Sequence, residues 1–198
     1  MIIRSINIQD VNDDQLRLWF EQMDEEKKSS VSLMQNEHKR KQRICADALC
    51  RNTLSDFCGI DPDKICFELS PDGKPYAKNL AVHFSISHSG DFAVCAVSET
   101  ETGIDIEKKR SVHPRVCEKF CTEAETDYVH TCENGLFEIW TLKEAYFKCI
   151  GTGLGSDIKN ISFSVENNKI SCSEKGFEFS FVEIDKNYIC SVCKKAAR

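Results

Sequence analysis

The stretch from residue 84 to residue 107 constrains the fold of this 198-residue chain more than any other part of the sequence. Three short apolar runs alternate there with tight polar turns; the runs are residues 84–87, 92–97 and 104–106. Runs of this length and composition are typical of strands, and short turns between them favour antiparallel pairing of neighbours. The stretch therefore predicts a three-stranded antiparallel meander.

Asp105 and Glu107 lie in the third run, where they alternate with Ile104 and Ile106. Side chains two residues apart on a strand project to the same side, so the carboxylates should project together while the isoleucines face the core. Like charges that close either raise a pKa or gather a cation, and oxygen ligands suit Mg²⁺. The alternative is a solvated strand edge with two ordinary acids, which is the commoner meaning of so short a motif.

Composition indicates a soluble globular protein, since 41% of the residues are hydrophobic and 29% are charged. The length suits one large domain or two small ones. No apolar run approaches the roughly 20 residues needed to cross a bilayer, and the first residues lack the long apolar segment of a signal peptide. We therefore expect a cytoplasmic protein without membrane contact. The net charge of −6 argues against a nucleic-acid partner.

The 12 cysteines are expected to be reduced packing residues, because many lie inside periodic apolar segments where a thiol acts as a small hydrophobe. Cys190 and Cys193 form one CxxC motif. Without a second CxxC or a nearby pair of histidines, this motif does not predict a zinc or redox site.

A basic segment runs from Lys27 to Arg51 and holds seven Lys or Arg residues against two acids, a local excess of +5. Such a segment fits either a patch for phosphate groups or an acidic partner, or the solvated face of a helix. Composition leaves both readings open.

Helical periodicity predicts helices around residues 12–23, 37–57, 123–131 and 136–150. The last of these carries Trp140, Glu144 and Lys148 at i, i+4 spacing, so Glu144 and Lys148 share a face. The commoner meaning of this spacing is a stabilising surface pair. Further strands are predicted over residues 2–8, 65–69, 161–165, 177–184 and 188–192.

Both halves of the chain thus contain helices followed by antiparallel strands, which predicts an α+β fold of two pseudo-symmetric lobes. We expect an N-terminal lobe over residues 1–102 and a C-terminal lobe over residues 103–198, each a three-stranded meander packed with helices. Asp105 and Glu107 would then lie between the lobes, where ligands commonly bind.

Four motifs together resemble those of the 4′-phosphopantetheinyl transferases, and they occur in the order of that family. They are GKP at residues 73–75, FSISHSG at residues 84–90, GIDIEK at residues 103–108 and WTLKEAYFK at residues 140–148. The resemblance covers about residues 15–195. The chain length is similar to that of the single-chain, two-lobed, surfactin-synthetase-activating class rather than the half-length class that trimerises, which implies a monomer.

The resemblance implies transfer of 4′-phosphopantetheine from coenzyme A to a serine of an apo carrier protein, with release of adenosine 3′,5′-bisphosphate. Such carriers belong to peptide, polyketide and fatty-acid synthases. Asp105, Glu107 and Glu144 match the family's Mg²⁺ ligands. Glu144, or Glu107 through a water, would take the serine proton, and Lys148 would stabilise or protonate the leaving phosphate.

The resemblance also implies a set of coenzyme A contacts. Ser87 and His88 match the phosphate-binding pair, Lys74 matches a loop lysine near the adenine, and Lys143 precedes the catalytic glutamate in the usual register. Gln42 stands where the family has an arginine for the 3′-phosphate, and one of its two neighbours, Lys41 or Arg43, is the expected substitute. At the start of the basic segment, Lys27 or Lys28 is the expected match to a second family lysine.

Two other classes use the same residues differently. A Mg²⁺-dependent phosphoesterase would activate water, and a non-catalytic carrier-protein binding module would keep the fold without turnover. Mass spectrometry of an apo carrier incubated with coenzyme A and Mg²⁺ separates all three classes.

Overall fold

The computed structural model describes residues 1–153, 155–167 and 169–196. The strands are β1 (Ile2–Asn7), β2 (Phe67–Leu69), β3 (Pro75–Ala77), β4 (His83–Ser89), β5 (Phe92–Ser98), β6 (Thr102–Lys108), β7 (Phe163–Glu166), β8 (Lys169–Cys172), β9 (Phe177–Phe181) and β10 (Tyr188–Lys195). The α-helices are α1 (Asp13–Glu21), α2 (Glu25–Ser32), α3 (Glu37–Cys58), α4 (Glu123–Thr131) and α5 (Gly135–Ile150). Short 3₁₀ turns are η1 (Ile8–Asp10), η2 (Pro62–Lys64), η3 (Pro114–Lys119) and η4 (Ser156–Lys159).

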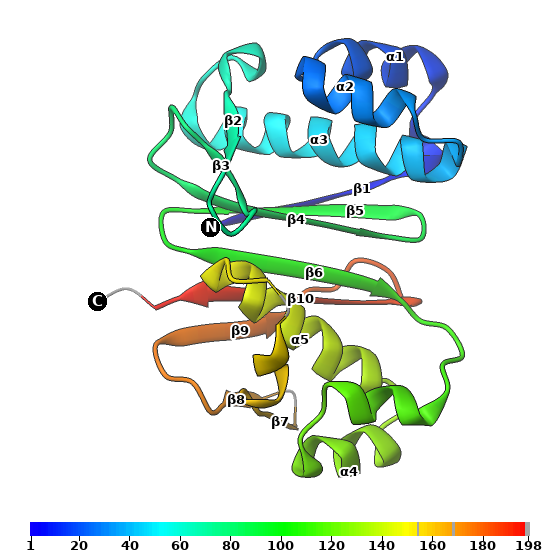
Figure 1. Ribbon diagram of the computed structural model, residues 1–198, viewed down its shortest axis with the longest axis vertical. Helices are drawn as coiled ribbons and strands as arrows, with labels where there is room; N and C mark the ends of the chain where they lie inside the picture. The colour runs from blue at the N-terminus through cyan, green and yellow to red at the C-terminus, as the bar shows by residue number, and fades with distance from the viewer. Residues whose placement is uncertain (154, 168, 197–198) are drawn as a thin grey trace.

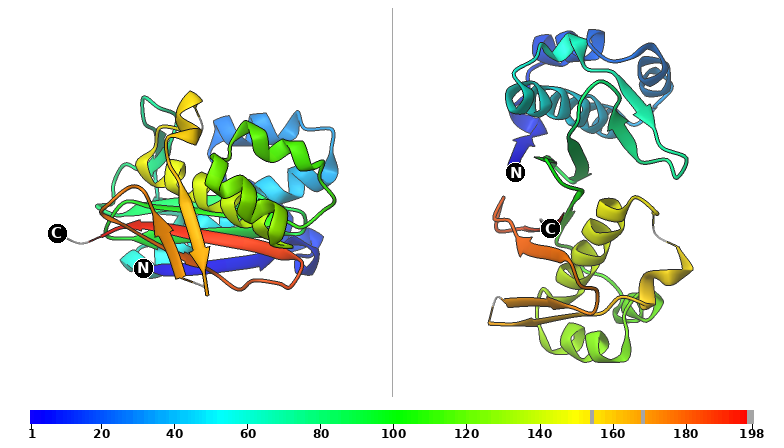
Figure 2. Two further views of the ribbon diagram at one scale, coloured as in Figure 1. Left: turned by 90° about the horizontal axis from the view of Figure 1, so that it is seen from below. Right: turned by 90° about the vertical axis from the view of Figure 1, so that its left-hand side faces the viewer.

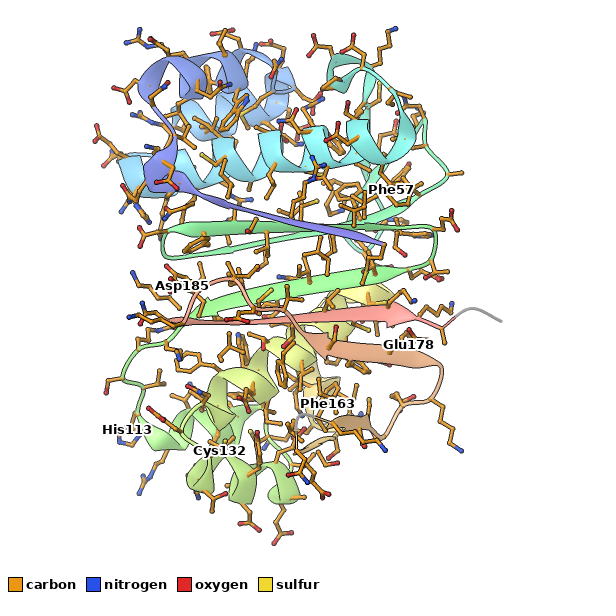
Figure 3. The ribbon with its side chains drawn as sticks, turned by 180° about the vertical axis from the view of Figure 1, so that it is seen from behind. Phe57, His113, Cys132, Phe163, Glu178 and Asp185 are labelled. Atoms are coloured by element: carbon orange, nitrogen blue, oxygen red, sulfur yellow. The ribbon has the colours of Figure 1, made fainter. Side chains whose placement is uncertain are left out.

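These elements form four layers, with helices on the outside and two three-stranded antiparallel sheets between them (Figure 1). The predicted α+β class with two lobes is confirmed. Each lobe keeps a core of its own: Phe57 and Phe163, labelled in Figure 3, belong to the N-terminal and C-terminal cores respectively. None of the helices in the described ranges has the length and apolar character needed to cross a membrane.

The first sheet has the strand order β1-β5-β4, and α3 covers its outer face. Leu54 of α3 is fully buried and belongs to the same cluster as Phe84 of β4. The helix begins after Asn36, whose side chain accepts a hydrogen bond from the main-chain N–H of Lys39. It ends at Gly59, which has the left-handed conformation. This packing against α3 holds β4, which is an edge strand of the sheet, in place.

The second sheet has the strand order β6-β10-β9, and α5 covers its outer face. Leu142 and Ala145 of α5 are fully buried in one cluster with Cys193 of β10. The helix ends at Gly151, whose positive φ of 85° suits a residue without a side chain. This sheet therefore supports the helix that carries Glu144 and Lys148.

The predicted meander is wrong in its third strand. β4 and β5 form the expected hairpin, but β6 pairs with β10, so that Ile106 lies opposite Cys190. The third strand of the first sheet is β1, which pairs with β5. The second sheet is not a meander either, because β7 pairs with β8 in a separate hairpin. Periodicity identifies strands, whereas their partners depend on contacts between distant parts of the chain.

Apolar side chains of β6 and β10 pack on the inner face of β5, between the two sheets. Val94 and Ala96 of β5 lie there in one buried cluster with Ile104, Ile106 and residues of β10. The isoleucines thus face a core, as predicted, but the core is the layer that joins the lobes. β6 begins at Thr102, so the predicted boundary after residue 102 falls inside this strand.

The cysteines that the sequence places in apolar segments are buried. Cys45, Cys50, Cys95, Cys149 and Cys190 are all in this group. Their position fits the predicted packing role.

Gly103 allows β6 to cross α5 at close range, so a larger residue at this position should destabilise the fold. A Cβ at Gly103 would lie 1.9 Å from the carbonyl oxygen of Ala145 and 2.5 Å from the main-chain nitrogen of Cys149. We expect Gly103→Ala to lower the free energy of unfolding by about 1–3 kcal/mol or more, because neither main-chain atom can move without displacing the helix. Urea unfolding measures this change.

Gly155→Ala is the matched control, because a Cβ there would meet no atom of the described residues within 4 Å and the residue has no left-handed φ. Its free energy of unfolding should stay within about 0.5 kcal/mol of the wild-type value. Equal stability of the two variants would contradict the close crossing of β6 and α5.

Candidate active site

Asp105 lies at the centre of the candidate site, on β6. Its side chain is buried, with the residue only 5% exposed. Oδ1 accepts hydrogen bonds from Nζ of Lys148 at 2.6 Å and from Oγ of Ser87 at 2.7 Å. Oδ2 is buried and accepts no hydrogen bond from the described part of the chain. A buried carboxylate oxygen without a partner is costly, so this atom is a candidate ligand for a cation.

Glu107 is partly exposed and lies two residues further along β6. Its Oε2 accepts hydrogen bonds from Oγ of Ser89 and from Nη1 of Arg110, both at 3.0 Å. Both carboxylates of β6 are thus held by serines of β4, which confirms that Asp105 and Glu107 face a common side.

Ser85, Ser87 and Ser89 form a serine ladder along β4. The hydroxyls of Ser85 and Ser89 accept hydrogen bonds from the main-chain N–H groups of Ile104 and Lys108, both at 3.1 Å. Later serines of β4 contact later residues of β6, so the two strands run in the same direction. They are joined through side chains rather than through main-chain pairing. Ser85, Ser89 and Arg110 were not among the predicted site residues. Serine at every second position of FSISHS was the signal for the ladder.

Glu144 faces the two carboxylates of β6 from α5. Burial raises the pKa of its carboxyl to about 7, the negative charges of Asp105 and Glu107 act in the same direction, and Lys148 opposes them. Burial also raises the pKa of Asp105. The fold therefore gathers the predicted residues Asp105, Glu107, Glu144 and Lys148 from one strand and one helix.

The donor set fits a hard divalent cation in its chemistry. Carboxylate oxygens are the ligands that Mg²⁺ prefers, and the unpartnered Oδ2 of Asp105 offers one of them. Among the described residues, no three His, Cys, Asp or Glu side chains converge closely enough to form a metal site as they stand. The ammonium of Lys148 provides positive charge beside Asp105. Mg²⁺ at this position stays a prediction.

Positive groups from both lobes lie beside His88, which is partly buried on β4. Burial lowers the pKa of this histidine, and the positive charges of Arg43 and Lys148 lower it further. Arg43 itself is exposed on α3. Of the predicted phosphate contacts, Ser87 thus touches the carboxylate cluster, His88 follows it on β4, and the charge of Arg43 acts on His88.

A pocket of about 240 Å³ lies between the lobes, next to this cluster. Lys148 lines it together with Asp72, Gly73, Lys74, Pro75, Phe84, Ser85, Ile86, Phe147, Gly151 and Gly153. Figure 2 shows the β2–β3 hairpin leaving the N-terminal lobe on the side where α5 ends. The pocket walls therefore come from both lobes, as expected for a site between them.

Two predicted coenzyme A contacts on α2 are engaged elsewhere. Lys27 pairs with Asp47 and lies over the ring of Phe67, with Nζ 4.1 Å from the ring centroid. Lys28 pairs with Glu21 and Glu25. Within the described residues, neither lysine contacts the carboxylate cluster. Their role in coenzyme A binding stays a prediction.

Gln42 is buried and serves the turn between β4 and β5. Its Nε2 donates to the carbonyl oxygen of Gly90 at 2.6 Å, and Nε2 of His38 lies 2.9 Å from the same oxygen. Gln42 thus holds the turn, while the neighbouring Arg43 is the exposed cation.

The structure corrects the prediction that Lys143 contacts coenzyme A. Lys143 is fully buried, and its ammonium donates to the carbonyl oxygens of Phe120, Ile158 and Ile161 at 2.8–2.9 Å. It also pairs with the equally buried Glu125 at 2.8 Å. An ammonium has three donors, and all are used inside the C-terminal lobe. The residue next to Glu144 in sequence therefore anchors α5 and is not available to a ligand.

Each lobe of the chain matches a family model. The family model described as 4′-phosphopantetheinyl transferase, N-terminal, matches residues 10–100, and that of the 4′-phosphopantetheinyl transferase superfamily matches residues 101–193. The chain is 30% identical over 161 residues to 4′-phosphopantetheinyl transferase gsp of Aneurinibacillus migulanus, which covers 76% of this chain and 67% of the relative. It is 30% identical over 168 residues to a 4′-phosphopantetheinyl transferase of Bacillus subtilis, which covers 76% and 72%.

Among solved structures, the holo-[acyl-carrier-protein] synthase of Thermotoga maritima matches with a TM-score of 0.43 and 23% identity, over 50% of this chain and 64% of that chain. The sequence relatives are the stronger finding, because they span most of both proteins at 30% identity. The chain belongs to the 4′-phosphopantetheinyl transferase superfamily and is a transferase.

Proposed function

We propose that this transferase moves the 4′-phosphopantetheine group of coenzyme A to a serine hydroxyl of an apo carrier protein or carrier domain, and leaves adenosine 3′,5′-bisphosphate. One observation carries the proposal: Asp105, Glu107, Glu144 and Lys148 gather beside a pocket that Lys148 also lines. The relatives' names support a phosphopantetheinyl transfer. We also propose that the protein works as a cytoplasmic monomer.

The reaction requires a serine oxygen to attack a phosphorus of the pyrophosphate while the leaving phosphate departs in line. The site must neutralise phosphate charge, align the reacting groups and remove the serine proton. When bound, Mg²⁺ would supply positive charge to the pyrophosphate, and Asp105, Glu107 and Glu144 would hold it.

The chain's own residues divide the remaining work. The carboxylate of Glu144 can accept the serine proton, since its pKa of about 7 lies near neutral pH. Glu107, acting through a water, is the second candidate base. Lys148 is 30% exposed and can donate to the leaving phosphate. Arg43 and His88 would bind further phosphate oxygens, and the effect of the Arg43 charge on His88 supports a joint role.

The decisive test incubates the protein with coenzyme A, Mg²⁺ and an apo carrier protein and weighs the carrier by mass spectrometry. A gain of one phosphopantetheine supports the transfer. Cleavage of coenzyme A without a gain would show the phosphoesterase, and carrier binding without turnover would show the binding module.

The carboxylate cluster generates a prediction about turnover. We expect Glu144→Gln to lower kcat by about 10²- to 10⁴-fold, the range of general acid–base catalysis, because the amide cannot accept a proton. Asp105→Ala should also lower kcat, and the double variant should lose less than the product of both losses, because ligands of one ion act as a unit. Turnover measured against Mg²⁺ concentration tests all three variants.

Glu178→Gln on β9 is the matched control, because its side chain is 63% exposed and pairs with Lys194 outside the cluster. It should keep the wild-type kcat and Mg²⁺ dependence. A wild-type kcat and metal dependence in Glu144→Gln or Asp105→Ala would remove that residue from the site.

Arg43 generates a prediction about coenzyme A affinity. We expect Arg43→Ala to raise the KM for coenzyme A by roughly 10-fold or more at nearly constant kcat, because a charge-assisted hydrogen bond to phosphate contributes about 1.5–3 kcal/mol. Lys39→Ala removes the same charge from an exposed position of the same helix and should leave the KM unchanged. Equal KM values for both variants would place the phosphate contact elsewhere.

A further inference from the structure

Lys74 reaches from one lobe into the other. It lies in the turn between β2 and β3 of the N-terminal lobe, yet its Nζ donates to the carbonyl oxygen of Cys149 at 2.9 Å and to that of Thr102 at 3.3 Å. Cys149 belongs to the last turn of α5, and Thr102 is the first residue of β6. The ammonium is therefore engaged by main-chain oxygens of the C-terminal lobe.

The contact with Cys149 caps α5 from outside its own lobe. The last carbonyl groups of a helix have no partner within the helix, and this end carries partial negative charge that a lysine stabilises. Gly151 leaves room for the lysine stem, since a Cβ there would lie 3.2 Å from Cδ of Lys74. Among the described residues no carboxylate lies within ion-pair distance of Lys74, and burial lowers the pKa of its ammonium.

The turn that carries Lys74 is held together by its own hydrogen bonds. The carbonyl oxygen of Lys74 accepts from the N–H of Ser70 at 2.8 Å, and the Lys74 N–H donates to Oγ of Ser70 at 3.0 Å. The N–H of Gly73 donates to the carbonyl oxygen of Ser70 at 2.9 Å. Fixing Lys74 therefore fixes the whole turn, which lines the same pocket as Lys148.

We propose that Lys74 is a positioning residue, which joins the two lobes by capping α5 and so fixes both the pocket wall at residues 72–75 and the helix end that carries Lys148. This differs from the direct coenzyme A contact that the family resemblance implies, because the ammonium donates its hydrogen bonds to main-chain oxygens of the described residues. The consequence for coenzyme A rests on the proposed function, whereas the joining of the lobes does not.

Hydrogen exchange of the ligand-free protein tests the joining of the lobes. We expect Lys74→Met to speed hydrogen exchange at the amides of Gly73 and Gly151 by about tenfold or more. A hydrogen bond to a charged group stabilises the closed form of the turn and of the helix end, and its loss raises the population of the open form by about that factor. Lys78→Met, directly after β3, removes the same charge from an exposed pair with Glu68 and should exchange like the wild type. Unchanged exchange in Lys74→Met overturns the proposal.

Calorimetric titration with coenzyme A and Mg²⁺ tests the consequence for the pocket. We expect Lys74→Met to raise the Kd by about tenfold, by the same factor at low and high salt, and Lys74→Arg to restore part of the affinity, because it keeps the N–H donors. A loss of affinity that shrinks with salt, without faster exchange, would show a direct phosphate contact and overturn the proposal. Faster exchange with an unchanged Kd would overturn the positioning of the pocket.

The test of the lobe contact stays decisive if coenzyme A does not bind or if the first variant does not fold. A wild-type protein that does not bind coenzyme A would refute the proposed function, while the exchange comparison would still decide whether Lys74 joins the lobes. If thermal unfolding shows that Lys74→Met does not fold, Lys74→Gln takes its place, since its shorter side chain ends in an uncharged amide whose N–H donors cannot span the same distance. Wild-type exchange in that variant would likewise overturn the proposal.

Discussion

The side-chain contact between β4 and β6 is the constraint on which the candidate site depends. β6 carries Asp105 and Glu107 but belongs to the second sheet, so main-chain pairing with β4 cannot place these carboxylates against the first lobe. The serine ladder does so, because a short hydroxyl can donate to a carboxylate and accept from an N–H group. The same contacts that join the lobes therefore also orient the acids.

Three lysines at the lobe interface and on α5 show how differently buried cations are balanced. Lys143 is closed off by Glu125 and three carbonyl oxygens, an arrangement in which every donor is satisfied. Lys148 is only partly compensated by Asp105 and remains accessible to the pocket. Lys74 is held by carbonyl oxygens. Of these three lysines, only Lys148 combines an accessible ammonium with a contact to Asp105, whose Oδ2 has no partner among the described residues, which makes it the cation suited to chemistry.

Local pattern was sufficient to predict the acids on β6, the helix that carries Glu144 and Lys148, and the β4–β5 hairpin, because each depends on the period of a single element. It could not reveal the partner of β6, the enclosure of Lys143, for which the family resemblance implied a coenzyme A contact, or the contacts of Lys74 with the C-terminal lobe. In each case the deciding contact lies far away in sequence: β10 pairs with β6, Glu125 and Ile161 surround Lys143, and Cys149 accepts from Lys74.

By itself, the sequence determined which residue types share a strand or helix face and which motifs resemble the transferase family, because spacing and residue chemistry are local properties. Only the tertiary structure decided that β6 joins the second sheet, that Lys143 is enclosed and that Lys74 caps α5. A lysine has the same formal charge in solvent, beside a carboxylate or against a helix end. What it does depends on the groups that folding brings to its ammonium, and those groups come from other parts of the chain.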